Sequence, residues 1–290
     1  MSEQNYESSR LAPETAYTAW FRMLGSLGNI NQIRSPEQHN RIMKTLFDIW
    51  KMLCRVRKLL LIHVQSKDTQ HGDLYFDGPP LLIFAPWLFE AIQTLPVTHR
   101  EGKLSAYRLL CSMGVFNHDV PPTPDFLDMF LLTIYEGLLS GDEDIIHVII
   151  SSCKVDFFHR CWPSSTLLLP LFTTACCEIG QKACFIPKVE ALTILSSFVC
   201  FPNHFEQLDV LSNKDKEYVP VTVDRTYLKR MIMRDLIKAS QLDPMLESRE
   251  IALCGLAIFL CEELKHQRME SPIKPFIVFT VECLQVSFVY

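Results

Sequence analysis

The stretch from Arg41 to His63 reads RIMKTLFDIWKMLCRVRKLLLIH, with a large apolar residue at almost every turn. One set of apolar residues recurs at spacings of four and three, which is the period of an α-helix: Ile42, Leu46, Ile49, Leu53, Val56 and Leu60. A second set lies beside the first and widens the apolar face: Met43, Phe47, Trp50 and Cys54. The pattern predicts a helix with the first stripe buried, packed against two neighbours.

The residues just before this stretch predict where the helix begins. Ser35 precedes Pro36, and Gln38 follows the serine by three positions, which gives an N-cap, a proline in the first turn and a partial capping box. Basic residues are threaded through the helix, so a membrane-surface or calmodulin-type amphipathic helix is the alternative interpretation. We favour a core helix of an all-helical protein.

Composition favours a helical protein with a large core. The 290 residues are 48% hydrophobic and carry a net charge of −5, with Lys and Arg spread along the chain. Nucleic-acid binding requires clustered basic residues, so no nucleic-acid partner is expected. No apolar run reaches the length of a transmembrane segment, and the N-terminus MSEQNYESSR does not resemble a signal sequence. We therefore expect no transmembrane segment and a cytoplasmic protein.

The same pattern of turn, apolar helix and turn recurs along the chain. Beyond the first helix it predicts helices near residues 86–95, 101–114, 124–140, 143–153, 164–180, 187–200, 224–240, 247–266 and 272–288. Consecutive helices in pairs every 40–50 residues indicate an all-α fold, an α-solenoid of HEAT-like repeats. We expect a polar tail at 1–18, a helical-repeat scaffold at 19–290, and loops or linkers near 65–80 and 208–223.

The segment PPTPDFLDMFLLTIYEGLLSGDEDIIHVIISSC contains clear helix boundaries. Thr123 and Pro124 predict a helix start, and Gly141 predicts its end; one face carries Phe126, Phe130, Ile134 and Leu138. Ser140 and Glu143 have the spacing of a capping box for the next helix. The acidic run Asp142, Glu143 and Asp144 is interpreted as part of that helix start rather than as a calcium or magnesium site, since it lacks an EF-hand pattern.

Eleven cysteines and nine histidines raise the question of catalysis or metal binding. The cysteines form no C-x-x-C pair and lie mostly in apolar helical runs, so buried free thiols are expected, with the adjacent Cys176 and Cys177 the only suspected redox pair. A Cys–His nucleophile is conceivable as Cys161 with His159 or Cys153 with His147. No phosphate-binding, dinucleotide, nucleophile-elbow or zinc-protease motif occurs. We predict no catalytic, cofactor-binding or metal-binding residues, hence no enzyme and no cofactor.

Five stretches together resemble a known family. They are APWLFEAIQTL, HREGKLSAYRLLCSM, DFLDMFLLTIYEGLLSGDEDIIHVIISSC, EALTILSSFVCFPNHF and IALCGLAIFLCEEL. In order and spacing they resemble the central helical region of the alpha subunits of the Ral GTPase-activating protein complex, which are relatives of tuberin. The resemblance covers roughly residues 19–288 and consists of long hydrophobic helices rather than a compact catalytic motif.

The resemblance implies a scaffold function. In that family a separate C-terminal GAP domain supplies an asparagine and accelerates GTP hydrolysis on Ral-type small GTPases, so no asparagine of this chain is expected to take that role. The alpha subunit works as a heterodimer, which implies the beta subunit of the complex as partner and a Ral-type GTPase as an indirect one. We expect a fragment of a larger protein that supports assembly. An unrelated helical-repeat adaptor is the alternative, and a Cys–His hydrolase a distant third.

The resembling stretches contain the candidate interface or core residues. Trp87 and Phe89 follow Pro86 and are most simply core anchors, with an exposed interface role as the alternative. Lys103, Tyr107 and Arg108 lie beside Gly102 in a helix start that we expect to pack closely against its predecessor, or to present a Lys/Arg pair to a partner. A repeat array cut at its end exposes an apolar face, so self-association is expected from PIKPFIVFTVECLQVSFVY at residues 272–290.

Overall fold

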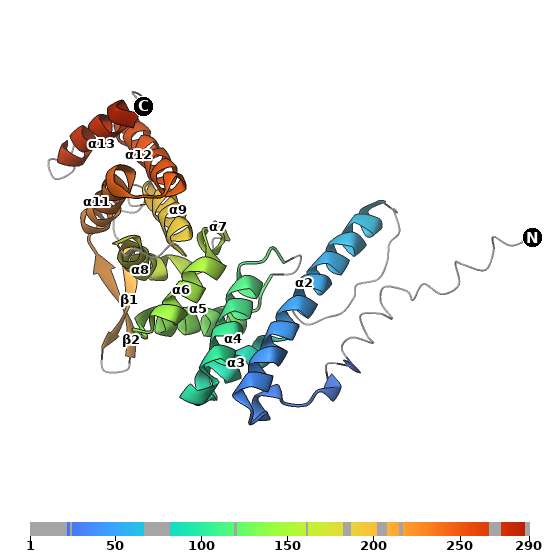
Figure 1. Cartoon of the computed structure of the whole chain (residues 1–290). Helices are drawn as coiled ribbons and strands as arrows, with labels where there is room; N and C mark the ends of the chain where they lie inside the picture. Colours follow the sequence, from blue (N-terminus) through green and yellow to red (C-terminus); the bar gives the residue numbers. More distant parts are fainter. Residues whose placement is uncertain are drawn as a thin grey trace, which may run out of the picture. The chain divides into compact units, whose positions relative to one another are not determined.

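A computed structural model of the chain describes residues 22–23, 25–66, 82–118, 121–160, 162–181, 187–201, 208–214, 217–266 and 274–287. Helices account for most of this part of the chain, as the sequence predicted (Figure 1). The chain divides into two compact units, Met1–Ala106 and Tyr107–Tyr290, and the division falls inside one helix. The predicted tail at 1–18 lies outside the described residues, as does most of the predicted loop at 65–80.

The first unit is built around one long helix. Its elements are η1 (Ile30–Gln32), α2 (Pro36–Ser66), α3 (Ala85–Thr94), η3 (Val97–His99) and the first half of α4 (Arg100–Gly114). The short η1 and η3 both pack on α2, and η1 also packs on α3. The unit therefore holds its elements together through the first turns of α2.

The predicted start of α2 is confirmed, whereas the predicted buried stripe is only partly correct, because Leu46 and Leu53 are buried and Val56 is not. The backbone N–H of Gln38 donates to Ser35 Oγ at 3.4 Å, and Pro36 opens the helix. The buried residues of α2 combine members of both predicted apolar sets with one histidine: His39, Met43, Leu46, Trp50 and Leu53. Val56 is exposed and Ile42 is only half-buried. The helical period of α2 was therefore predicted correctly. Its buried face is rotated from the predicted stripe towards His39, Met43 and Trp50, and the pattern missed His39 because histidine does not count as apolar.

The second unit is a stack of helices with one hairpin. Its elements after α4 are α5 (Pro124–Leu139), α6 (Glu143–Cys153), α7 (Asp156–His159), η4 (Ser165–Leu168), α8 (Leu169–Gln181), α9 (Lys188–Phe198), β1 (Leu208–Lys214), β2 (Glu217–Val223), α11 (Arg225–Leu242), α12 (Leu246–His266) and α13 (Lys274–Ser287). Helix α5 packs on α6, both pack on α8, and α8 packs on α9 and α11. Helix α12 packs on α9 and α11, and α13 packs on α11 and α12 (Figure 1).

Aromatic rings fill the core of the second unit. Phe157 lies 4.8 Å from Phe172 between ring centroids, and Phe158 lies 4.5 Å from Phe198. Phe130 of α5 lies 6.0 Å from Phe157. All five rings are buried, which makes them a large share of the apolar area removed from water. The sequence did not predict α7, which carries two of the rings, because four residues are too few to show a period.

The boundary between α5 and α6 corrects one sequence interpretation. Thr123 caps α5 as predicted, with its Oγ1 accepting from the Phe126 N–H at 3.3 Å, and Gly141 has a φ of +70° just after the helix. The N-cap of α6 is Asp142, whose Oδ1 accepts from the backbone of Asp144 at 3.0 Å. The predicted cap Ser140 instead ends α5 and donates to Gly137 O at 2.7 Å. The predicted capping box is therefore wrong, although the acidic residues do lie at the helix start.

The predicted loop or linker at 208–223 is also corrected, because this segment forms a β-hairpin. Strands β1 and β2 pair antiparallel from Leu208 opposite Val223 to Lys214 opposite Glu217. The polar turn between them led to the loop interpretation, but YVPVTV at 218–223 alternates β-branched residues in the manner of a strand. Pro220 is compatible with a strand here since both strands of a two-stranded sheet are edge strands.

Candidate functional site

The first predicted candidates, Trp87 and Phe89, lie in α3 of the first unit. Phe89 is 5% exposed and belongs to the core. Trp87 is half-buried, with its ring stacked on Phe84 at 6.3 Å between centroids. Its backbone carbonyl accepts a hydrogen bond from Asn31 Nδ2 at 3.0 Å. Trp87 therefore borders a polar cluster that the sequence patterns did not indicate.

The other candidates, on α4, do not form one site. Lys103 is half-buried in the first unit, while Tyr107 and Arg108 belong to the second. Tyr107 is buried, and burial raises the pKa of its phenol well above the usual value. Arg108 is exposed. Of this set, Arg108 is the side chain most open to a partner, and Tyr107 is a core residue.

The polar cluster of the first unit joins four of its elements. Asn31 Nδ2 donates to Glu90 Oε2 at 3.0 Å, and Asn29 Nδ2 donates to Glu90 Oε1 at 3.0 Å. Asn31 Oδ1 lies 3.1 Å from His39 Nε2. The ring of His99 meets the ring of His39 edge-on at 5.5 Å. We call these five residues the Asn–His cluster; it links η1, α2, α3 and η3.

The hydrogen bonds of the cluster fix the proton on His39. Because the Asn31 amide nitrogen donates to Trp87 O and Glu90, its oxygen faces His39 and accepts from Nε2–H. His39 Nδ1 is then the unprotonated nitrogen; it is buried without a hydrogen-bond partner. Gly102 of α4 packs directly on it, since a Cβ at that position would lie 2.2 Å from Nδ1. The close packing expected at Gly102 is therefore present, and a histidine ring is its cause.

Burial and hydrogen bonding shift two pKa values within the cluster. Burial, together with the nearby His99, lowers the pKa of His39. Hydrogen bonds from the amides of Asn29 and Asn31 lower the pKa of Glu90, which is half-buried. A neutral histidine and an ionised glutamate are therefore the forms that the folded unit favours. This arrangement joins segments and offers no nucleophile.

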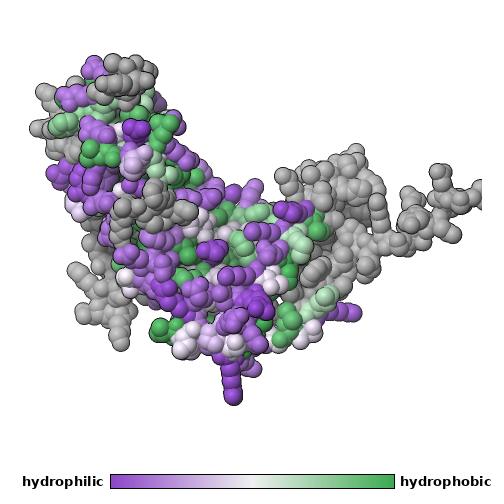
Figure 2. All heavy atoms as spheres, in the orientation of Figure 1, coloured by the Kyte–Doolittle hydropathy of each residue, from purple (hydrophilic) through white to green (hydrophobic). Residues whose placement is uncertain are grey.

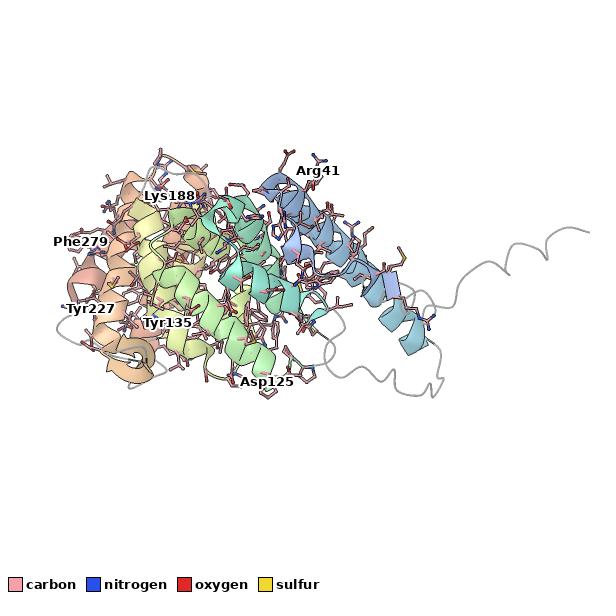
Figure 3. All side chains as sticks on the ribbon, turned by 90° about the horizontal axis from the view of Figure 1, so that it is seen from below. Arg41, Asp125, Tyr135, Lys188, Tyr227 and Phe279 are labelled. Carbon is pink, nitrogen blue, oxygen red and sulfur yellow. The ribbon has the colours of Figure 1, made fainter. Side chains whose placement is uncertain are left out.

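The second unit buries whole charges in pairs. Lys188, labelled in Figure 3, lies at the start of α9, and its Nζ is 2.5 Å from Asp243 Oδ2 at the end of α11. Lys229 of α11 pairs with Glu263 of α12, and its ammonium lies 5.5 Å from the Phe259 ring centroid. Both pairs are almost completely buried. They connect neighbouring helices of the stack, and each charge has an opposite charge in contact.

The cysteines are free thiols wherever the structure describes them, and most are buried. Burial raises the pKa of Cys176 and of Cys177 far above the usual thiol value, so the suspected redox pair remains protonated at neutral pH. Burial also raises the pKa of Cys153, which leaves the suggested pairing with His147 without a thiolate. Cys161 lies outside the described residues. Two thiols differ from the prediction, because Cys254 and Cys261 are exposed on α12.

The described residues contain neither a cluster suited to a metal ion nor a helix suited to a membrane span. No group of three or more His, Cys, Asp or Glu side chains within them is arranged to hold a metal ion. None of the helices within the same ranges is long and apolar enough to cross a membrane.

The chain is similar in sequence to proteins of one family. It is 35% identical over 91% of its length to the mouse Ral GTPase-activating protein subunit alpha-2 and 34% identical over 95% to the human subunit alpha-1. The chain is a relative of the Ral GTPase-activating protein alpha subunits. It spans only 14% and 13% of the length of those two alpha subunits.

A more distant relative of the chain also matches. A probable Rho GTPase-activating protein of Drosophila melanogaster is 24% identical over 87% of the chain, which again covers 13% of that protein. No protein-family model matches the chain. No solved structure matches it either.

Proposed function

We propose that this chain is a non-catalytic, protein-binding segment of a Ral GTPase-activating protein alpha subunit. In this proposal it binds the beta subunit of the complex in the cytoplasm. A GAP domain outside the segment then accelerates GTP hydrolysis on Ral-type small GTPases. The observation that carries the proposal is the 35% identity to the mouse alpha-2 subunit across 91% of the chain. The relatives are named as subunits, which favours an assembly function.

The packing of the second unit supports a scaffold. Helices α5 and α6, α8 and α9, and α11 and α12 pack as successive pairs, each against the next. We propose that these pairs form a HEAT-like α-solenoid, also described as an armadillo-type fold. Such arrays bind partners through extended faces rather than through a compact pocket.

The state of the thiols supports the absence of catalysis. A cysteine nucleophile needs a lowered pKa and access to solvent. Burial raises the pKa of Cys153 and Cys176, and both are fully buried. Because the proposal places the GAP domain outside this segment, we also expect the purified chain, added alone to a GTP-loaded Ral-type GTPase, to leave the rate of GTP hydrolysis unchanged.

The deciding experiment is co-purification of the 290-residue chain with the beta subunit of the Ral complex. An unrelated helical-repeat protein is the negative control, and circular dichroism confirms that the chain is folded. We expect the beta subunit to be retained by this chain and not by the control. Failure of a folded chain to retain it would overturn the assembly role.

A charge reversal makes this experiment more specific. Arg108→Glu changes the exposed candidate on α4, and Arg230→Glu makes the same change at an exposed position on α11. We expect Arg108→Glu to weaken retention of the beta subunit while Arg230→Glu leaves it unchanged. Equal retention by both variants would remove Arg108 from the contact.

A further inference from the structure

Helix α12 has apolar residues on two opposite faces. Its inner face packs against α9 and α11 and contains Ala252, Leu256 and Phe259. Its outer face is solvent-exposed and contains Cys254, Ile258 and Cys261, spaced by four and three residues. Ile258 is 51% exposed, and Leu264 beside this face is 64% exposed. We call Glu250, Cys254, Ile258, Cys261 and Lys265 the α12 outer face.

The neighbouring helix α13 does not cover this face. Helix α13 packs on α11 and α12, yet Ile258 and both cysteines remain exposed. The surface over α12 and α13 shows hydrophobic residues among hydrophilic ones (Figure 2). Water contact at adjacent apolar side chains of one helix is unfavourable, and a partner helix would remove it.

The charges of the α12 outer face are complementary to those of the same face on a second copy whose α12 runs antiparallel. Glu250 is exposed near the start of the helix, and Lys265 is exposed near its end. Both are equally distant in sequence from the midpoint between Ala257 and Ile258, and so are Cys254 and Cys261. In an antiparallel pair, Glu250 therefore faces Lys265 of the second copy, and Cys254 faces Cys261 of the second copy. The residues nearest the two-fold axis, Ala257 and Ile258, are apolar.

We propose that the α12 outer face is a self-association surface on which a second copy of this chain docks antiparallel. Two-fold pairing is the commonest symmetry of homo-oligomers and requires this kind of self-complementary surface. A single helix pair buries less area than a standard stable interface, so the dimer is weak and depends on concentration. The inference is independent of the proposed function, because it uses only residues of α12.

The first test is sedimentation equilibrium of the whole chain across a range of concentrations in a reducing buffer. We expect a monomer–dimer equilibrium. Ile258→Glu places two like charges at the axis and should weaken the dimer by about tenfold or more. Leu139→Glu is the matched control, since Leu139 is also 51% exposed but lies at the end of α5. A chain that stays monomeric at every concentration would overturn the proposal, as would a dimer insensitive to Ile258→Glu.

A charge swap tests the antiparallel register. Glu250→Lys alone should weaken the dimer by about threefold, because the new lysine faces Lys265 of the second copy. Adding Lys265→Glu in the same chain should restore the affinity. If the double variant is as weak as Glu250→Lys alone, the register is wrong.

Cross-linking by diamide, a thiol oxidant, tests the register directly. One thiol of Cys254 and one of Cys261 from the other copy lose two protons and two electrons to diamide, which becomes its hydrazine, and one S–S bond forms. Mass spectrometry should identify Cys254 joined to Cys261 between copies, and either Cys254→Ser or Cys261→Ser should abolish the doubly linked dimer. A Cys254–Cys254 product as the main species would indicate parallel pairing and overturn the proposal.

Discussion

The two units of this chain bury polar groups in different ways. The first unit joins its segments through the neutral amide and imidazole groups of the Asn–His cluster, whose one carboxylate, Glu90, is only half-buried. The second unit buries full charges as the pairs Lys188–Asp243 and Lys229–Glu263. Breaking the hydrogen bonds of a neutral polar group costs less than leaving a buried ion without its partner. The two units should therefore respond differently to mutation and to pH.

The largest expected effect is in the second unit. Lys229→Met should lower the free energy of unfolding by about 3–5 kcal/mol, because it leaves the buried carboxylate of Glu263 without its ammonium. The double variant Lys229→Met with Glu263→Leu should recover most of the loss, since it removes both charges. Urea denaturation of the three proteins measures this.

The corresponding change in the first unit should cost less. Asn31→Ala removes the bonds to Trp87 O, Glu90 and His39, for which we expect a loss of about 1–3 kcal/mol. An equal or larger loss than that of Lys229→Met would contradict the distinction between the units. Hydrogen exchange at the amides of α3 and of α12 reports each unit separately.

The next prediction concerns the contact between Gly102 and His39. Gly102→Ala should destabilise the first unit by about 1–3 kcal/mol, because the new methyl group would overlap the His39 ring. Gly180→Ala is the matched control, since Gly180 is also helical but has open space around it. That change should stabilise α8 by about 0.5–1 kcal/mol through helix propensity. Thermal melts of both variants should therefore shift in opposite directions.

A further prediction concerns how the stability of the first unit depends on pH. The pKa of His39 is lower in the folded unit than in the unfolded chain, so the unfolded chain binds a proton more readily. The free energy of unfolding therefore falls as the pH drops below about 6.5 towards the pKa of the folded state. Between pH 6.5 and 5.5 one such group can remove at most about 1.4 kcal/mol. Glu90 also has a lowered pKa, and its contribution is lost at lower pH, below about 4.5. The interval from 6.5 to 5.5 therefore reports His39.

The measurement for this prediction is hydrogen exchange at the two pH values, corrected for the intrinsic rate. We expect the amides of α3 to lose protection on acidification. His39→Gln keeps a donor for Asn31 Oδ1 and removes the titrating group, so protection in that variant should no longer depend on pH over this interval. A dependence that persists in the variant would assign the effect to another group.

The sequence predicted the helices better than it predicted their buried faces. Periodicity located α2, α3, α5, α11 and α12 closely, because each repeats an apolar spacing over several turns. It predicted only part of the buried face of α2, since His39 is also buried there and its hydrogen bond to Asn31 joins segments that only the fold brings together. Hydrogen-bonded residues of the Asn–His cluster lie up to 61 positions apart, as Asn29 and Glu90 do, and no local pattern links them.

The candidate residues show the same limit. Phe89 and Tyr107 are apolar or aromatic within helical runs, and both are buried. The buried lysines were not predicted, because a lysine in a sequence is usually a surface residue until its carboxylate partner is known. The exposed cysteines on α12 were missed for the opposite reason, since their apolar neighbours predicted burial.

The smallest predicted effects concern the helix caps, where sequence and structure agree for α2 and differ for α6. Asp142→Ala should cost about 1 kcal/mol, because its carboxylate accepts from the N–H groups of Asp144 and Ile145 at the start of α6. Ser35→Ala in the first unit should cost less, since Ser35 makes one long bond of 3.4 Å to Gln38. Urea denaturation of both variants and of Ser140→Ala tests which residue caps α6. If Ser140→Ala lowered the free energy of unfolding more than Asp142→Ala does, the capping box predicted from the sequence would be correct, and Asp142 would not be the cap.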